Sequence, residues 1–88
     1  MVDTCAAQEP AGVRTLAKIE TNNIGRKFPN ALPAEMTLGT SDPRIGTATL
    51  NVLDCVAKAA QAKGDTVLAA QTGRATQLYQ QALGRLGR

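Results

Sequence analysis

With 88 residues, the chain is long enough for one domain, residues 1–88, and too short for a second independent core. Ala accounts for 15 of the hydrophobic residues, Phe and Tyr occur once each and Trp is absent, so the core is thin and suits closely packed helices. The formal charge of +3 permits an anionic partner without requiring one, and the absence of His removes the commonest general base.

The first ten residues, MVDTCAAQEP, lack the basic start and the continuous apolar run of a signal peptide or a membrane span. We therefore expect no membrane partner and no secretion by a signal peptide. The expected location is the cytoplasm or the inside of an assembled particle.

Residues 10–24 carry two competing patterns. Pro10 suits the start of a helix, and a helix would bring four residues to one face: Val13, Leu16, Ala17 and Glu20. Alternate positions between residues 13 and 21 also resemble, in part, one face of a strand. A helix is the favoured interpretation, and the strand stays open as the alternative.

Residues 25–42 are interrupted by glycines and prolines, which break any long regular element. We expect an extended arm here. The arm is too apolar for a free linker, because it carries Phe28, Leu32, Met36 and Leu38. These four side chains are predicted to contact either the rest of the chain or a partner protein.

Residues 43–63 are predicted to form a helix. Asp42 can cap its first turn, Pro43 suits the first helical position, and Gly64 is placed to end it. At 100° per residue one face is apolar and contains Ile45, Thr49, Val52, Leu53, Val56, Ala59 and Ala60. Asp54 and Lys58 are predicted to form an ion pair on the opposite face.

Residues 66–86 are predicted to form a second helix, capped by Asp65. Its apolar stripe contains Leu68, Thr72, Ala75, Tyr79, Ala82, Leu83 and Leu86. The short connection predicts that the two helices fold back on each other, so the expected fold is a small, mainly α-helical domain built on an antiparallel two-helix hairpin. Gly73 and Gly84 lie on one side of the second helix, either as tolerated weak points or where another backbone approaches.

Cys5 and Cys55 are the only cysteines, and the chain has no His, so an ordinary zinc site is excluded. Free, buried thiols are the favoured interpretation, with a disulfide as the alternative. Neither cysteine has a recognisable activating neighbour, the carboxylates form no obvious pair, and no phosphate-binding glycine motif is present. We therefore expect no enzyme activity, no metal, no cofactor and no small-molecule substrate.

Arg74, Arg85 and Arg88 share one side of the second helix with Gln77 and Gln81. Such a row can contact a phosphate backbone, which makes RNA or DNA binding the alternative function. No aromatic residues interleave to stack on bases, so a solvated helix face is the favoured interpretation of the row.

Three apolar residues fall outside the stripes of the hairpin: Leu50, Val67 and Leu78. Together with the apolar arm, they indicate a surface that residues 1–42 or another protein must cover. The predicted function is therefore a non-catalytic structural or accessory subunit of a larger assembly, such as a phage or virus particle. Its expected partner is another protein or a second copy of the chain.

Overall fold

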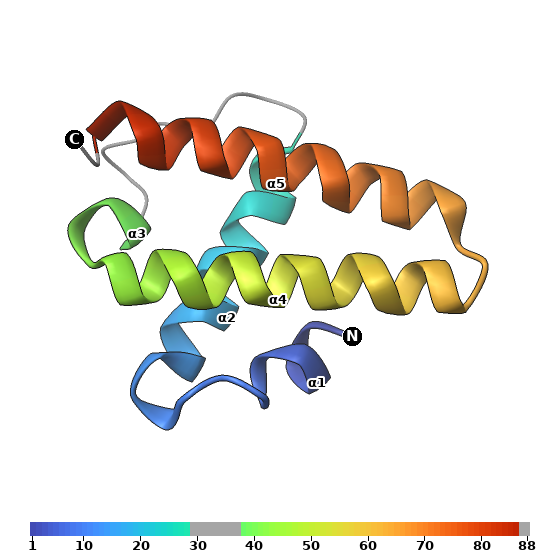
Figure 1. Ribbon diagram of the computed structural model, residues 1–88, viewed down its shortest axis with the longest axis horizontal. Helices are drawn as coiled ribbons and strands as arrows, with labels where there is room; N and C mark the ends of the chain where they lie inside the picture. Colours follow the sequence, from blue (N-terminus) through green and yellow to red (C-terminus); the bar gives the residue numbers. More distant parts are fainter. Residues whose placement is uncertain (29–37, 87–88) are drawn as a thin grey trace.

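The computed structural model describes residues 1–28 and 38–86, apart from the side chains of Thr40, Arg85 and Leu86. These residues form five helices and no strand, which confirms the predicted mainly α fold. The helices are α1 (Val2–Ala6), α2 (Ala11–Lys27), α3 (Leu38–Ser41), α4 (Pro43–Ala62) and α5 (Thr66–Leu86). The two longest, α4 and α5, lie side by side as an antiparallel hairpin, and α2 crosses them (Figure 1).

The beginning of α4 agrees with the prediction from sequence. Asp42 Oδ1 accepts the backbone N–H of Arg44 at 3.0 Å, and Pro43 takes the first helical position. On the exposed face, the predicted ion pair forms between Lys58 Nζ and Asp54 Oδ2 at 3.0 Å. Local signals therefore determine where this helix starts.

The turn of the hairpin also agrees with the prediction, except that α4 ends at Ala62. Gly64 has a φ of 77°, the left-handed conformation in which a side chain would be strained. Asp65 Oδ1 then accepts the backbone N–H of Leu68 at 3.0 Å and caps α5. A helix stop followed at once by a helix cap produces the tight reversal.

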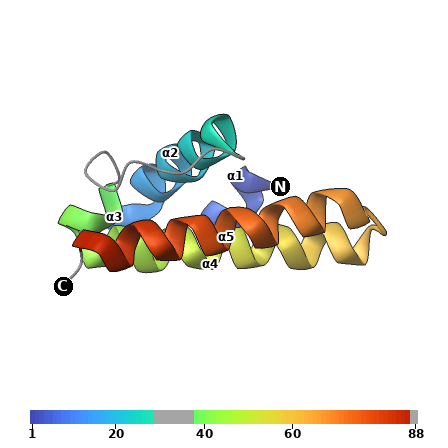
Figure 2. The same cartoon turned by 90° about the horizontal axis from the view of Figure 1, so that it is seen from above.

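Residues 11–27 form a helix, so the strand alternative for this segment is wrong. The buried face of α2 contains Val13, Ala17, Glu20, Thr21 and Ile24. Leu16, predicted on that face, is 37% exposed because it falls on the flank of this stripe. The helix lies with α1 on one side of the hairpin layer (Figure 2).

The five residues of α1 form an element that the sequence pattern did not predict. A disulfide joins Cys5 of α1 to Cys55 of α4, with a Cα–Cα distance of 5.7 Å. The interpretation of both cysteines as free thiols is therefore wrong. Fifty positions separate them, so only the packing of α1 against α4, and not any local motif, brings the sulfurs together.

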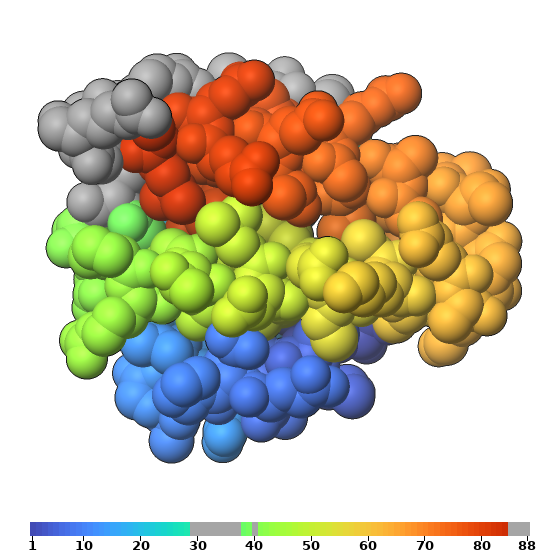
Figure 3. All heavy atoms as spheres, in the orientation of Figure 1, coloured from blue at the N-terminus to red at the C-terminus, as the bar shows by residue number. Residues whose placement is uncertain are grey.

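The core consists of two clusters that share α4. The first cluster joins α1, α2 and α4 and contains Cys5, Ala6, Val13, Ala17, Ile45, Ala48, Val52 and Val56. The second joins α2, α4 and α5 and contains Ile24, Leu53, Ala75, Tyr79 and Ala82. In the space-filling view, α1 and the first part of α2 form a border along α4 (Figure 3). The N-terminal helices therefore pack against the hairpin mainly along α4.

The expected extended arm, residues 25–42, is shorter than predicted. Residues 25–27 complete α2 and residues 38–41 form α3, while residues 29–37 lie outside the described part of the chain. Gly39 of α3 approaches α4 and α5 closely, because a Cβ added to it would lie 2.8 Å from both the Gly46 Cα and Leu83 Cδ2. Because Gly39 has no side chain, α3 can pack directly against α4 and α5. From the sequence, this glycine was expected only to interrupt regular structure.

Candidate functional site

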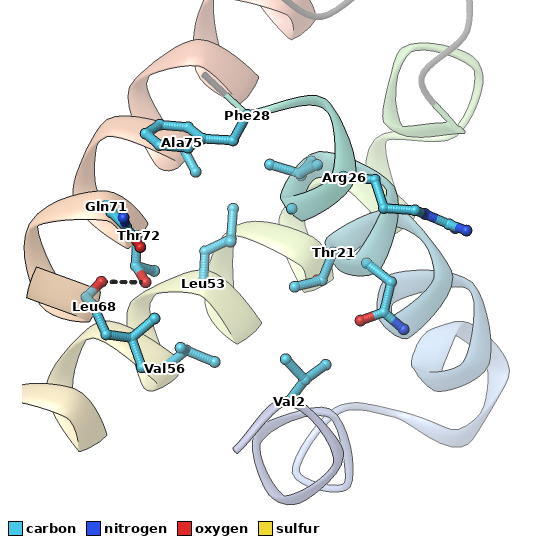
Figure 4. A pocket seen from close by; sticks show the side chains of 13 residues that line it. Val2, Thr21, Arg26, Phe28, Leu53, Val56, Leu68, Gln71, Thr72 and Ala75 are labelled. Atoms are coloured by element: carbon cyan, nitrogen blue, oxygen red, sulfur yellow. Dashed lines mark hydrogen bonds between the residues drawn. The ribbon is translucent and has the colours of Figure 1, made fainter. Parts of the chain in front are cut away.

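A pocket of about 580 Å³ opens between α2, α4 and α5, and Val2 of α1 forms part of one side (Figure 4). We call it the interhelical pocket. Its apolar lining contains Val2, Ile24, Phe28, Leu53, Val56, Leu68 and Ala75. Four helices thus contribute to one apolar depression, whose volume lies in the usual range for ligand or side-chain binding pockets, about 300–1,000 Å³.

The amphipathic pattern of the helices explains how the lining forms. Leu53 and Val56 face inward from α4, while Leu68 and Ala75 face inward from α5. Phe28 follows the last residue of α2 and lies near Ala75 at one end of the pocket (Figure 4). Residues that a helical wheel assigns only to a core therefore also line an opening at the surface.

The polar side chains of the described lining are those of Thr21, Asn22, Arg26, Gln71 and Thr72. The hydroxyls of Thr21 and Thr72 donate to the carbonyls of Ala17 and Leu68, each at 2.8 Å, so their donors are already used. Among the described residues of the lining, Arg26 alone is ionisable, and its side chain extends away from the apolar part of the pocket (Figure 4). The apolar side chains of the described lining are therefore suited to holding apolar groups.

The buried ionisable side chain Glu20 lies outside the pocket lining. Its Oε2 accepts hydrogen bonds from the Tyr79 hydroxyl at 2.9 Å and from the Gly39 backbone N–H at 3.0 Å. Burial and the hydrogen bond to Glu20 both raise the pKa of Tyr79 above its ordinary value, with burial as the larger cause. Because Glu20 is 2% exposed and Tyr79 is fully buried, we assign this network to holding α2, α3 and α5 together.

The described members of the predicted partner-binding set differ in their surroundings. Phe28 lines the interhelical pocket, whereas Val67 is 66% exposed outside its lining. The remaining described residues are half-buried: Leu38 against the first cluster, and Leu50 and Leu78 against the second. Leu32 and Met36 lie outside the described residues.

The predicted phosphate contacts are described only in part. Arg74 is exposed on α5, as are Gln77 and Gln81 on the following turns. The side chain of Arg85 and the whole of Arg88 lie outside the described part. Whether the three arginines form a row at the surface therefore stays a prediction.

The sequence pattern missed the interhelical pocket because its apolar residues carry the same helical periodicity as a filled core. The pocket depends on how far apart α2, α4 and α5 pack, which the periodicity of one helix does not record. A second feature without a sequence signal is a pocket of about 290 Å³ above the disulfide. In residues 1–28 and 38–86, no group of three His, Cys, Asp or Glu side chains is placed to hold a metal ion.

Comparison of the chain with protein-family models, curated proteins and solved structures finds no match. Within the described ranges, no helix has both the length and the apolar character needed to cross a membrane. The functional assignment therefore depends on the geometry of the chain itself.

Proposed function

We propose that the chain is a non-catalytic structural or accessory subunit that binds another protein, and that the interhelical pocket is its binding site. The observation that carries this proposal is the apolar lining contributed by α1, α2, α4 and α5 around about 580 Å³. A pocket of this kind suits apolar side chains presented by a partner, for instance along one face of an amphipathic helix.

Charge at the pocket indicates the chemistry of the partner. Arg26 is an ionisable residue of the lining, and Lys27 follows it at the end of α2. A partner with a carboxylate beside its apolar anchors would complement this basic side of the pocket. A stable interface usually covers about 800 Å² on each protein, so the pocket would form the centre of a larger contact.

The disulfide helps to choose between the two expected locations of such an assembly. Of the two expected locations, the cytoplasm and an assembled particle, the Cys5–Cys55 bond favours the particle. Disulfides persist in oxidising surroundings and are rare in the reducing cytoplasm, and a phage or virus particle leaves that compartment on release. We therefore favour a subunit of a particle over a free cytoplasmic protein.

The proposal is tested by comparing two adjacent residues of α5. Leu68 lines the pocket and is half-buried, whereas Val67 is exposed outside its lining. Leu68→Gln is expected to weaken binding of the protein that co-purifies with the native chain by about tenfold or more. Val67→Gln should leave it unchanged. Circular dichroism establishes that both variants are folded, and sedimentation of the chain alone distinguishes a second copy from a different partner.

Equal retention of the partner by both variants would exclude the interhelical pocket as the binding site. Loss of the partner through Val67→Gln alone would instead support binding at the surface predicted from Leu50, Val67 and Leu78.

A second candidate function is binding of RNA or DNA. It is favoured by the exposure of Arg74, Gln77 and Gln81 along α5. Arginines on such a face would contact phosphates, and their affinity would fall as salt rises. Replacing Arg74, Arg85 and Arg88 together by Gln should then abolish binding to nucleic acid at low salt. Unchanged binding would exclude this face.

A further inference from the structure

The Cys5–Cys55 disulfide forms part of a second, polar pocket of about 290 Å³ between α1 and α4. Side chains that surround the two sulfurs include Glu9, Asn51, Asp54 and Lys58. Cys5 is 3% exposed, whereas Cys55 is only half-buried. The disulfide is thus reached from solvent through this pocket, and Cys55 is its more accessible end.

We propose that this disulfide is a redox-modification site, at which a dithiol reductant releases α1 from the rest of the folded chain. In the first step a thiolate of the reductant attacks Cys55 Sγ and forms a mixed disulfide. The bond between the two protein sulfurs breaks, and Cys5 leaves as a thiolate that takes up a proton.

In the second step the second thiolate of the reductant attacks the reductant sulfur that is bonded to Cys55 Sγ. Cys55 leaves as a thiolate and is protonated. The protein gains two electrons and two protons, and the reductant ends as a disulfide. Attack at Cys55 agrees with its greater exposure.

Without the covalent bond, α1 retains few interactions. It has five residues and no side-chain cap at its start, and isolated helices of this length are unstable. Its segment is otherwise held by the packing of Ala6 and Val2 against the first cluster, which buries little apolar surface because Ala6 is small. An exposed ion pair between Lys18 and Asp3, at 2.6 Å, and an exposed 3.2 Å hydrogen bond from Asn51 to Glu9 add to this packing. Exposed polar contacts of this kind contribute little stability.

The packing of α5 against α2 and α4 does not involve α1. The second cluster contains residues of α2, α4 and α5 only, and the hydrogen bonds of Glu20 join α2 to α3 and α5. Reduction should therefore free residues 1–9 while the hairpin remains folded. Since Val2 lines the interhelical pocket, release of α1 would also open one side of the proposed binding site, a consequence that rests on the proposed function.

The test uses the full chain and dithiothreitol, without any partner protein, so its result is independent of whether the chain binds proteins. Thiol labelling with mass spectrometry follows the reduction, and hydrogen exchange follows each helix. We expect reduction under native conditions, complete loss of exchange protection at the hydrogen-bonded amides of residues 5–9 and unchanged protection in residues 68–83. Small additions of urea should leave the reduction rate unchanged, because direct attack needs no unfolding.

A Cys5→Ala/Cys55→Ala variant is the matched control. It should lack protection at the amides of residues 5–9 from the start, and dithiothreitol should not change its exchange. Three results would overturn the proposal: reduction that accelerates steeply with urea, protection of α1 that survives reduction, or loss of protection throughout α5 when the disulfide breaks. Each would mark the bond as a structural crosslink instead.

Discussion

The Tyr79 hydroxyl donates a 2.9 Å hydrogen bond to Glu20 Oε2 across a separation of 59 residues. The same carboxylate oxygen accepts the backbone N–H of Gly39 at 3.0 Å. One buried acid therefore connects α2, α3 and α5. Among the described side chains, no Lys or Arg forms an ion pair with Glu20, so these hydrogen bonds compensate for burying its polar side chain.

Removing the Tyr79 hydroxyl should destabilise the fold. Tyr79→Phe leaves the buried Glu20 with one donor fewer, and the expected loss is about 1–3 kcal/mol of unfolding free energy. Urea unfolding followed by circular dichroism measures this loss. Glu20→Met removes the acceptor at similar side-chain length, and the two single variants with the double variant form a double-mutant cycle that isolates the coupling between the two side chains. Additive effects of the two substitutions would contradict the assigned hydrogen bond.

Stability should also depend on the ionisation of Tyr79. Burial and the hydrogen bond to Glu20 raise the pKa of Tyr79 in the folded chain above the ordinary value of 10.0. The unfolded chain therefore loses this proton first as the pH rises, and the unfolding free energy should fall above about pH 10. Below that pH the contribution is fully present.

Because Tyr79 is the sole tyrosine and Trp is absent, tyrosinate absorbance reports this group alone. Across the alkaline range, the unfolding free energy should fall more steeply with pH for the wild-type chain than for Tyr79→Phe. Lysine ionisation affects both proteins equally, so the difference in slope reports Tyr79. Identical slopes for the two proteins, or a Tyr79 titration at its ordinary pKa, would show that the hydroxyl is not held as described.

Replacing Gly by Ala should change the free energy of unfolding in opposite directions at two positions of the chain. Gly39→Ala places a methyl group against the Tyr79 hydroxyl and 2.8 Å from the Gly46 Cα, so a loss of about 1–3 kcal/mol is expected. Gly73→Ala meets no atom within 4 Å and should stabilise α5 by about 0.5–1 kcal/mol. Thermal or urea unfolding compares the pair, and equal effects would contradict the close packing of α3.

Loss of the disulfide should lower the free energy of unfolding substantially, but the hairpin should remain folded. The bond closes a loop of about 50 residues, for which the chain-entropy estimate is about 4 kcal/mol. Cys5→Ala/Cys55→Ala is expected to lower the urea midpoint accordingly while the helical circular dichroism signal of the hairpin persists. The wild-type chain in dithiothreitol should unfold at the same midpoint as the variant. An unchanged midpoint would mean that the cysteines are not joined in the folded protein.

The hairpin was predictable because its determinants are local. Asp42, Gly64 and Asp65 each act within a few residues, and the apolar stripes of α4 and α5 repeat at helical spacing. The helical assignment of residues 10–24 followed from the same periodicity. In contrast, Glu20 was assigned to the inner face of a helix without any sign of a partner, because Tyr79 lies 59 residues away.

Features that depend on packing between distant segments were not predictable. The pairing of Cys5 with Cys55 requires α1 to lie on α4, and no pattern in the first ten residues indicated that contact. Gly73 and Gly84 were candidates for a close approach, yet neither has an atom within 4 Å of an added Cβ. At Gly39, in contrast, the three nearest atoms all lie within 2.8 Å. Helical spacing places a residue on a face, but it does not show what that face meets.

The proposed binding site is tested most directly by hydroxyl-radical footprinting of the native complex against the free chain. We expect protection of Phe28, Leu53 and Leu68, which line the interhelical pocket, and unchanged oxidation of Val67, which lies outside its lining. Protection confined to Val67 or to the face of α5 around Arg74, with the pocket residues oxidised as in the free chain, would contradict binding through the pocket.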